Sequence, residues 1–316
     1  MTKPFDIVVV GGGIAGLTAA HHALLGGCTV GHVIGTEPIG GLVCNVGELS
    51  GYPVGTEPQS GIGLAVTLSA SNNELGGEET YGDATALAVD GSGFLIQTTD
   101  GELRANQVIA ATGARLRMLD VPGAEALVGR GVSQCAWCDG ALYKNKRVVV
   151  VGGGDAALEG ALHLSQYAKQ VAVVTRGDDL RGRQLYVDRI TGLDTTSIRL
   201  STDVAEILGS ESVEAVRVKD RSTGTSDTIE CDGVFVFVGL DPNTSLFDGP
   251  AKRGQDNGLL TNEAMETETP GLFAIGASRS GYRGRLVHAV SDAALAAMTA
   301  VTNCKRSNFG QISELQ

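Results

Sequence analysis

One eighteen-residue pattern occurs twice in the chain and constrains its fold more than any other feature. Residues 7–24 read IVVVGGGIAGLTAAHHAL, and residues 148–165, which begin 141 residues later, read VVVVGGGDAALEGALHLS. In each copy an unbroken, mostly β-branched run precedes a glycine turn and an Ala/Leu-rich stretch with helical spacing. Such a run is typical of a parallel strand that is buried on both faces. The repeat therefore predicts two strand–turn–helix units in an α/β protein.

Both glycine turns have the spacing of a dinucleotide-binding fingerprint. Its first glycine permits the tight turn, its second lets a pyrophosphate approach the backbone, and its third position lets the helix pack closely on the strand. Amides at the helix N-terminus and the helix dipole then hold the phosphates. The residues at these positions are Gly11, Gly13 and Gly16 in the first copy and Gly152, Gly154 and Ala157 in the second. Two copies indicate two dinucleotides, or one that is bound and one that visits.

The second copy starts well inside the chain, which indicates that one domain is split around another. Further buried strands that end at glycine turns are expected at residues 108–114, 234–239 and 272–276. A length of 316 residues suggests two domains. We therefore expect two Rossmann-like dinucleotide-binding domains, the second inserted into the first. The predicted ranges are 1–116 with 243–316 for the outer domain and 117–242 for the inserted domain, and the two crossovers are candidate hinges.

Charge and hydropathy exclude some classes of partner. The net charge of −12 argues against binding to nucleic acid or to an anionic membrane, because both require a basic surface. Glycines interrupt the apolar runs, and no run approaches the roughly 20 residues of a membrane span. The first residues, MTKPFD, lack the apolar core and cleavage site of a signal peptide. We therefore expect a soluble, cytoplasmic protein.

Two of the six cysteines form a pair, Cys135-Ala-Trp-Cys138, followed directly by Asp139. In a reducing compartment such a pair is usually redox-active or metal-binding. Structural zinc normally needs four ligands, and neither a second CxxC nor any histidine stands beside this pair in the sequence. We therefore expect no metal, and a dithiol in which one thiol is activated relative to the other. The histidines are His21, His22, His32, His163 and His288.

The residues around the dithiol have less certain roles. Asp139 is either a turn or N-cap residue, or the proton donor and acceptor for the thiolate that leaves during disulfide exchange. The other cysteines are isolated in the sequence and are expected to be small buried hydrophobes. They are Cys28, Cys44, Cys231 and Cys304.

Short motifs along nearly the whole chain accompany the dithiol. They are residues 11–16 (GGGIAG), Gly40-Gly41, Tyr52-Pro53, residues 111–113 (ATG), 129–133 (GRGVS), 135–140 (CAWCDG), 152–157 (GGGDAA), 239–244 (GLDPNT) and 270–276 (PGLFAIG). In this order they resemble the low-molecular-weight thioredoxin reductases. The CxxCDG motif between the ATG strand and the second glycine motif is the most specific part of the resemblance.

This resemblance implies an enzyme, a homodimeric flavin-dependent disulfide oxidoreductase. FAD would be bound by the outer domain and NADPH or NADH by the inserted domain, which swings about the hinges. Hydride would pass to FAD, and electrons would pass to the Cys135–Cys138 disulfide and on to a thioredoxin-like protein or a small disulfide. Cys138 would face the flavin and Cys135 would attack the substrate. Trp137, the only tryptophan, is then a flat contact for flavin or partner, or a core residue.

The resemblance also assigns cofactor contacts. For FAD they are Gly11, Gly13, Ile14, Ala15, Gly16, Thr36, Glu37, Gly40, Gly41, Asn45, Thr112, Gly113, Gly276, Ala277, Arg285, Leu286 and Val287. For the nicotinamide nucleotide they are Gly152, Gly154, Asp155, Ala156, Ala157, Arg176 and Arg181.

Three departures from the family pattern lie on cofactor surfaces. Gly177 stands where the family has an arginine of its 2′-phosphate site, so the preference for NADPH is open. Ala277 replaces a carboxylate that accepts hydrogen bonds from the flavin ribityl chain. Gly284-Arg285 stands in place of Arg-Gln beside the flavin. Arg279, Arg283 and Arg285 are expected either in a solvated loop or against flavin phosphate or a partner, and His288 either on a helix face or facing the flavin.

Because these changes leave the dithiol intact, we expect disulfide chemistry with an uncertain source of electrons. A reductase of the same fold could take electrons from ferredoxin, a deazaflavin or another flavin. A dithiol oxidase that passes electrons to oxygen would run the chemistry backwards, although such oxidases tend to carry His where this chain has Asp139. A non-catalytic flavin redox sensor is the fourth interpretation.

Overall fold

The computed structural model describes residues 3–49, 59–91 and 93–313, so the Tyr52-Pro53 motif lies outside the described residues. The chain forms two compact units: Met1–Arg115 with Asp241–Gln316, and Leu116–Leu240. The inserted range expected from the sequence, 117–242, differs from the second unit by one residue at its start and two at its end. Each unit contains one of the two glycine motifs.

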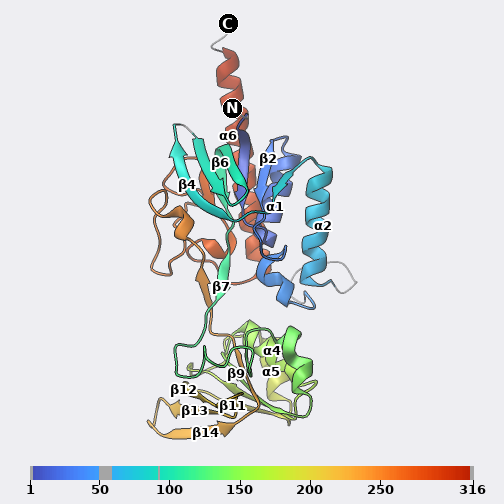
Figure 1. Ribbon diagram of the computed structural model, residues 1–316, viewed down its shortest axis with the longest axis vertical. Coiled ribbons are helices and arrows are strands. Elements are labelled where there is room, and N and C mark those ends of the chain that lie inside the picture. Colours follow the sequence, from blue (N-terminus) through green and yellow to red (C-terminus); the bar gives the residue numbers. More distant parts are fainter. Residues whose placement is uncertain (1–2, 50–58, 92, 314–316) are drawn as a thin grey trace. The chain divides into compact units, whose positions relative to one another are not determined.

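The first unit is built on a seven-stranded sheet (Figure 1). Its order is β3-β2-β1-β6-β5-β4, with β17 also pairing with β6. The strands β1, β2, β3, β6 and β17 pair in parallel, while β4 and β5 are antiparallel. The bounds are β1 (Phe5–Val10), β2 (Val30–Val33), β3 (Glu78–Thr80), β4 (Ala84–Asp90), β5 (Gly93–Thr98), β6 (Gly101–Ala110) and β17 (Leu272–Ala274).

Small residues bring helices α1 (Ile14–Leu25) and α6 (Leu286–Ser313) together in this unit. On α6 the buried positions Ala293, Ala296, Ala297 and Ala300 recur at the spacing of one helix face. They share a core cluster with alanines of α1 and with apolar residues of β1, β6 and β17. The remaining helical segments are α2 (Gly61–Glu74), which Ser60 caps, and the 3₁₀ helices η1 (Gly41–Asn45), η3 (Ser245–Phe247) and η4 (Gly276–Ser278).

The second unit contains a five-stranded parallel sheet and a smaller antiparallel sheet (Figure 1). The parallel sheet has the order β11-β10-β9-β15-β8, and the antiparallel sheet has the order β12-β13-β14. The parallel strands are β8 (Val132–Ser133), β9 (Arg147–Val151), β10 (Gln170–Val174), β11 (Thr196–Arg199) and β15 (Gly233–Val236). The other elements are β12 (Thr202–Leu208), β13 (Ala215–Asp220), β14 (Ser226–Glu230), α3 (Ala136–Asp139), η2 (Gly140–Tyr143), α4 (Asp155–Leu164) and α5 (Gln184–Thr191).

The two copies of the sequence repeat occupy equivalent places in their units. β1-α1-β2 and β9-α4-β10 are both strand–helix–strand units whose first strand lies in the interior of its sheet. That strand pairs in parallel on its other side with β6 in the first unit and with β15 in the second. The predicted α/β fold with two Rossmann-like units is confirmed.

Two short strands carry the chain between the units. β7 (Ala114–Leu116) and β16 (Leu240–Pro242) pair with each other. Next to them, the Asn243 amide donates to the Gly113 carbonyl over 2.9 Å, and the Arg117 amide donates to the Gly239 carbonyl over 3.0 Å. The entry and exit of the second unit are therefore adjacent.

Candidate active site

The dithiol lies in a tight turn of the second unit, where Cys135 and Cys138 form a disulfide with 5.3 Å between their Cα atoms. Cys135 is the N-cap of α3, and the Cys138 amide donates to the Cys135 Sγ over 3.1 Å. The Cys135 amide in turn donates to the Ser133 Oγ over 3.0 Å. Cys135 is half-buried and Cys138 is exposed. The chain itself thus holds the two sulfurs in the geometry of a closed ring.

The Asp139 carboxylate points back into this turn. Its Oδ2 accepts a hydrogen bond of 2.6 Å from the Ser133 hydroxyl. Asp139 also occupies the N-cap position of η2, but its side chain makes no capping bond to any described residue there. The interpretation as a capping residue is therefore wrong for its side chain. Ser133 was not among the predicted site residues, although it ends the GRGVS motif two residues before Cys135.

Trp137 stacks on His163 of α4, with ring centroids 3.8 Å apart and an interplanar angle of 28°. The sequence shows no histidine beside the dithiol, and the fold brings one there. His163 is 7% exposed, and this burial lowers its pKa, so the ring is neutral near pH 7. Trp137 is 37% exposed and is thus only partly a core residue. Within residues 3–49, 59–91 and 93–313, no three metal-ligating side chains come together.

The second glycine loop, in the same unit, has the shape that a pyrophosphate requires. Gly152 has φ +138°, and a Cβ there would lie 2.3 Å from the Phe237 carbonyl oxygen, so only glycine fits. A Cβ at Gly154 would meet no described atom within 4 Å, which leaves the start of α4 open to a ligand. Asp155, Ala156 and Ala157 form the first turn of α4. These features fit a dinucleotide.

A segment after β10 folds over this second loop. The Arg181 amide donates to the Gly153 carbonyl over 2.7 Å. The Arg183 amide donates to Asp155 Oδ1 over 2.6 Å, and Arg183 Nε lies 3.5 Å from Asp155 Oδ2. Arg176 and Arg181 have exposed side chains. Arg183 was missed in the sequence because only the fold shows that it faces Asp155.

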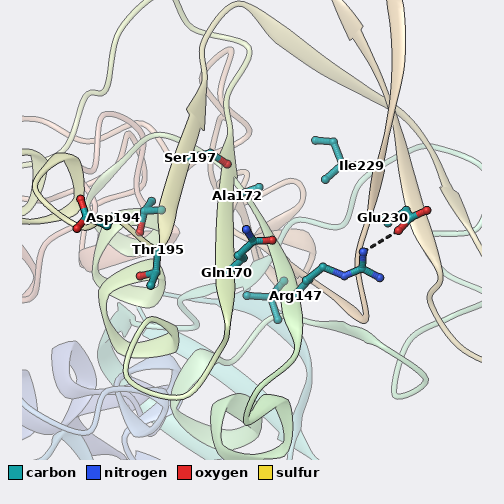
Figure 2. Close-up of a pocket in the computed structure, with 10 residues that line it drawn as sticks. Arg147, Gln170, Ala172, Asp194, Thr195, Ser197, Ile229 and Glu230 are labelled. Carbon is teal, nitrogen blue, oxygen red and sulfur yellow. Dashed lines mark hydrogen bonds and ion pairs between the residues drawn. The ribbon is translucent and has the colours of Figure 1, made fainter.

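The second unit also has a cavity of about 160 Å³ at the amino ends of its parallel strands (Figure 2). Arg147, Gln170 and Thr196, which begin β9, β10 and β11, contribute to its lining, and Arg147 pairs with Glu230 over 2.6 Å. Nucleotides bind at the carboxyl ends of parallel strands. Because this cavity lies at the amino ends, it is not the nucleotide site.

The first glycine loop, in the other unit, fits the pyrophosphate of FAD. Gly11 has φ +123°, and a Cβ there would lie 2.2 Å from the Ala111 carbonyl oxygen. A Cβ at Gly16 would lie 1.9 Å from the Gly11 carbonyl oxygen, so α1 can approach β1 only with glycine. At Gly13 the nearest atom to an added Cβ would be the Gly40 carbonyl oxygen at 3.8 Å, which leaves room for a phosphate.

Several predicted FAD contacts gather around the start of α1. The Gly40 amide donates to the Gly12 carbonyl over 2.8 Å, and Gly41–Asn45 follows as η1. An added Cβ at Gly276 would lie 3.0 Å from the Ala15 Cβ, and Leu286 packs in the apolar cluster that contains Ile14. Ala277 follows Gly276 in η4, and Arg285 and Val287 flank Leu286.

Other predicted FAD contacts have partners within the protein. Thr36 binds Asp83, with its amide donating to Oδ1 over 2.9 Å and its hydroxyl to Oδ2 over 2.8 Å. The neighbouring Glu37 is exposed. The Thr112 hydroxyl donates to the Asn243 carbonyl over 2.5 Å and, with Gly113, forms the turn after β6. Asp83 carried no signal in the sequence, because it belongs to no motif.

The arginine-rich segment before α6 is not a uniformly solvated loop. Arg279 has an 18% exposed side chain that binds the buried Asp292 of α6 through Nε at 2.6 Å and Nη2 at 2.9 Å. Asp292 Oδ2 also accepts the Gly276 amide over 3.1 Å. The solvated-loop alternative is therefore wrong for Arg279, whereas Arg283 and Arg285 are exposed. His288 is partly buried in the first turn of α6.

Two of the single cysteines are also closer than the sequence suggests. Cys231 is buried as expected, but Cys28, Cys44 and Cys304 are only partly buried. Cys28 and Cys304 pack against the same core cluster. The expectation of four isolated, buried cysteines is therefore wrong for three of them.

Comparison with known proteins identifies the chain's relatives. Residues 5–294 match the family described as pyridine nucleotide-disulphide oxidoreductase. The chain is 34% identical over 302 residues to the thioredoxin reductase of Treponema pallidum, covering 96% of this chain and 98% of that protein. It belongs to the thioredoxin reductase family. A thioredoxin reductase of Listeria innocua is 35% identical over 300 residues, covering 94% of this chain and 93% of the relative.

A solved structure of the thioredoxin reductase family agrees with this assignment. The thioredoxin reductase of Lactococcus lactis superposes with a TM-score of 0.91 at 32% identity, covering 96% of this chain and 99% of that chain. The chain is therefore a flavin-dependent disulfide oxidoreductase that uses FAD, as its family does. In the part of the chain that the structure describes, no helix is long and apolar enough to span a membrane.

Proposed function

We propose that the chain takes electrons from NADPH or NADH through FAD to the Cys135–Cys138 disulfide and passes them to a thioredoxin-like protein or a small disulfide. The observation that supports this is the disulfide itself, held in a turn with the Asp139 carboxylate. FAD, once bound, supplies the conversion between a two-electron hydride donor and a dithiol. We also propose that the enzyme acts as a cytoplasmic homodimer.

The family resemblance assigns the roles in the turn. Cys138 would face bound FAD, which would supply the electrons, and Cys135 attacks the substrate disulfide, forming a mixed disulfide and releasing one substrate thiolate. Cys138 then attacks the Cys135 sulfur and releases the second substrate thiolate. Asp139 protonates a leaving thiolate, and the Ser133 hydroxyl aims its carboxylate.

The second glycine loop supports a nicotinamide nucleotide as the donor. Gly152 permits the tight turn, Gly154 leaves room for a pyrophosphate, and Arg176 and Arg181 have exposed side chains. Gly177 lacks the guanidinium that would make NADPH the strongly preferred donor. Asp155 places a carboxylate in the first turn of α4, where an anion would bind. Because Asp155 belongs to the motif shared with the family, a second candidate rests on Gly177 instead: a disulfide reductase of the same fold whose physiological donor is a ferredoxin or a reduced flavin.

Anaerobic stopped-flow mixing of the oxidised holoenzyme with excess NADPH or NADH separates the two candidates. We expect rapid bleaching of the flavin absorbance band with at least one nucleotide. Absence of bleaching with both nucleotides, together with bleaching by reduced ferredoxin or a reduced flavin, supports the second candidate.

The Cys138→Ser variant tests the path after the flavin. Nucleotide should still bleach its flavin, but steady-state reduction of thioredoxin should fall by at least about 1,000-fold, because covalent exchange requires both thiols. Asp139→Asn should lower turnover by about 100-fold, as expected for the loss of a general acid. Undiminished turnover of Cys138→Ser would disprove the proposed function, and Cys44→Ser is the control.

A further inference from the structure

Cys28 and Cys304 lie 276 residues apart in the sequence but meet in the first unit. Cys28 follows the turn that ends α1, and Cys304 lies in α6. An added Cβ at Gly26 would lie 2.5 Å from Val301 Cγ2, so the end of α1 rests directly on α6 one turn before Cys304. Cys28 and Cys304 pack against the same apolar core cluster, within hydrogen-bonding reach of each other.

The surroundings of the two sulfurs are unequal. Gln107, a buried residue of β6, donates from Nε2 to the Cys304 Sγ over 2.9 Å and to the Ala300 carbonyl over 2.9 Å. The Cys304 sulfur thus accepts a hydrogen bond from a buried amide. Asn303 Nδ2 lies 3.3 Å from Gln107 Oε1, which fixes the direction of the Gln107 amide.

The hydrogen bond from Gln107 favours Cys304 as the thiolate, because a donor to the sulfur stabilises its charged form. The hydrogen bond with Cys28 lowers the pKa of Cys304, against the opposing effects of burial and of Asp6. The same hydrogen bond, with burial, raises the pKa of Cys28. A thiolate is the nucleophilic form of cysteine. Both side chains are partly exposed, so small oxidants can reach them.

We propose that Cys28 and Cys304 are a second redox-active thiol pair, which hydroperoxides oxidise to a disulfide that ties α6 to the end of α1. The Cys304 thiolate attacks a peroxide oxygen. An S–O bond forms, the O–O bond breaks, and the departing oxygen takes up a proton, leaving as water when the peroxide is hydrogen peroxide. The Cys28 thiol then attacks the Cys304 sulfenic sulfur, forming the S–S bond as the hydroxyl leaves with a proton as a second water.

The electrons in this reaction balance. The two sulfurs together lose two electrons, and the peroxide O–O bond receives them, so two thiols and one hydrogen peroxide give one disulfide and two waters. The reaction requires neither FAD nor the Cys135–Cys138 pair. It is therefore independent of the proposed function.

Peptide mass mapping of the reduced, FAD-loaded Cys135→Ser/Cys138→Ser protein tests this proposal. After brief treatment with a few equivalents of hydrogen peroxide and alkylation, we expect a linked Cys28–Cys304 peptide pair, while Cys44 and Cys231 remain alkylated. Treatment should also raise the apparent Tm by about 5 °C or more, because the cross-link closes a long loop.

Single variants assign the order of attack. In Cys28→Ser, peroxide should leave a Cys304 sulfenic acid that dimedone traps, whereas Cys304→Ser should leave Cys28 unmodified. Cys44→Ser is the matched control and should behave as the parent does. The proposal fails if no linked peptide forms in the folded parent, or if dimedone labels Cys28 in Cys304→Ser as strongly as it labels Cys304 in Cys28→Ser.

Discussion

The two glycine loops have nearly the same sequence, but their surroundings differ. The first turn of α1 has no acidic residue. The first turn of α4 begins with Asp155, whose carboxylate is bound by Arg183. In both loops the carbonyl of the middle glycine accepts a backbone amide, from Gly40 in the first loop and from Arg181 in the second.

This difference is consistent with tight binding of FAD at the first loop and weaker, reversible binding of a nucleotide at the second. A helix N-terminus attracts an anion, and at α4 the chain supplies a competing carboxylate of its own. The first turn of α1 carries no such carboxylate. We infer that permanent flavin binding and reversible donor binding derive from the same repeat through a few neighbouring side chains.

Replacing the first glycine of each loop should have the largest effect on ligand binding. Gly11→Ala places a Cβ 2.2 Å from a carbonyl oxygen at φ +123°, so FAD affinity should fall by at least about 100-fold. Gly152→Ala has the same clash in the second unit and should leave FAD bound, while flavin reduction by nucleotide falls about as much. Flavin absorbance per protein and stopped-flow bleaching measure the two effects.

Gly76→Ala is the control for backbone strain, because Gly76 has φ +86° but a Cβ there would meet no described atom within 4 Å. It should retain FAD and nucleotide reduction. Equal loss of FAD in Gly11→Ala and Gly152→Ala would show that the loops do not have separate ligands.

Gly177→Arg should increase the preference of the second unit for NADPH, because it adds a guanidinium to the segment after β10. The ratio of kcat/KM for NADPH to that for NADH should rise about 10-fold, because arginine binds a 2′-phosphate through paired hydrogen bonds. The Cβ would lie 3.2 Å from the Asp179 carbonyl oxygen, which requires a small shift. Gly177→Ala carries the same Cβ without the charge and should leave the ratio unchanged.

Asp155→Asn should have a smaller effect, because it removes the competing charge but keeps an oxygen for the Arg183 amide. The KM for the nicotinamide nucleotide should fall about threefold, in line with the modest energy of a charge at a helix terminus. Asp188→Asn on α5 is the control. A raised KM in Asp155→Asn would instead make this carboxylate a direct ligand of the nucleotide.

His22 and His163 occupy the same position in the two copies of the repeat. Replacing either one should change only the pH dependence of stability, which is the smallest of the expected effects. Burial lowers the pKa of His163, so below about pH 6.5 the unfolded chain takes up a proton that the folded ring resists. Stability of the second unit should therefore fall as the pH drops below that value. In His163→Gln this fall should be shallower, measured by urea unfolding followed by Trp137 fluorescence at pH 7 and 5.5.

His22→Gln is the counterpart in the first unit. Burial and His21 lower the pKa of His22, so it also resists protonation in the folded state. Because Trp137 lies in the second unit, its unfolding curve should not change in His22→Gln. An equal change in both variants would mean that the two units unfold together.

The strand–turn–helix units were predictable because their glycines are required by the local backbone conformation. Gly11 and Gly152 precede helices at a turn that other residues cannot make, and the sequence shows this directly. The dithiol was predictable for the same reason, since Cys135 and Cys138 are neighbours in one turn.

Contacts made across the fold were not predictable. His163 reaches Trp137 only because α4 packs beside the dithiol turn, and Asp292 meets Arg279 only because α6 returns to η4. Cys28 and Cys304 each look isolated in the sequence. A single sequence contains no distance between such residues, so their chemistry appears only when the chain is folded.

The pairing of β7 with β16 bears on how such a chain is assembled from parts. The polypeptide enters and leaves the second unit at neighbouring points, and Arg115 Nε lies 4.0 Å from Asp241 Oδ2. A host fold accepts an insertion most easily where the two cut ends already meet. Residues 116–240, which carry the dithiol and the second glycine loop, thus form an insertion whose two ends lie side by side in the sequence-distant strands β7 and β16.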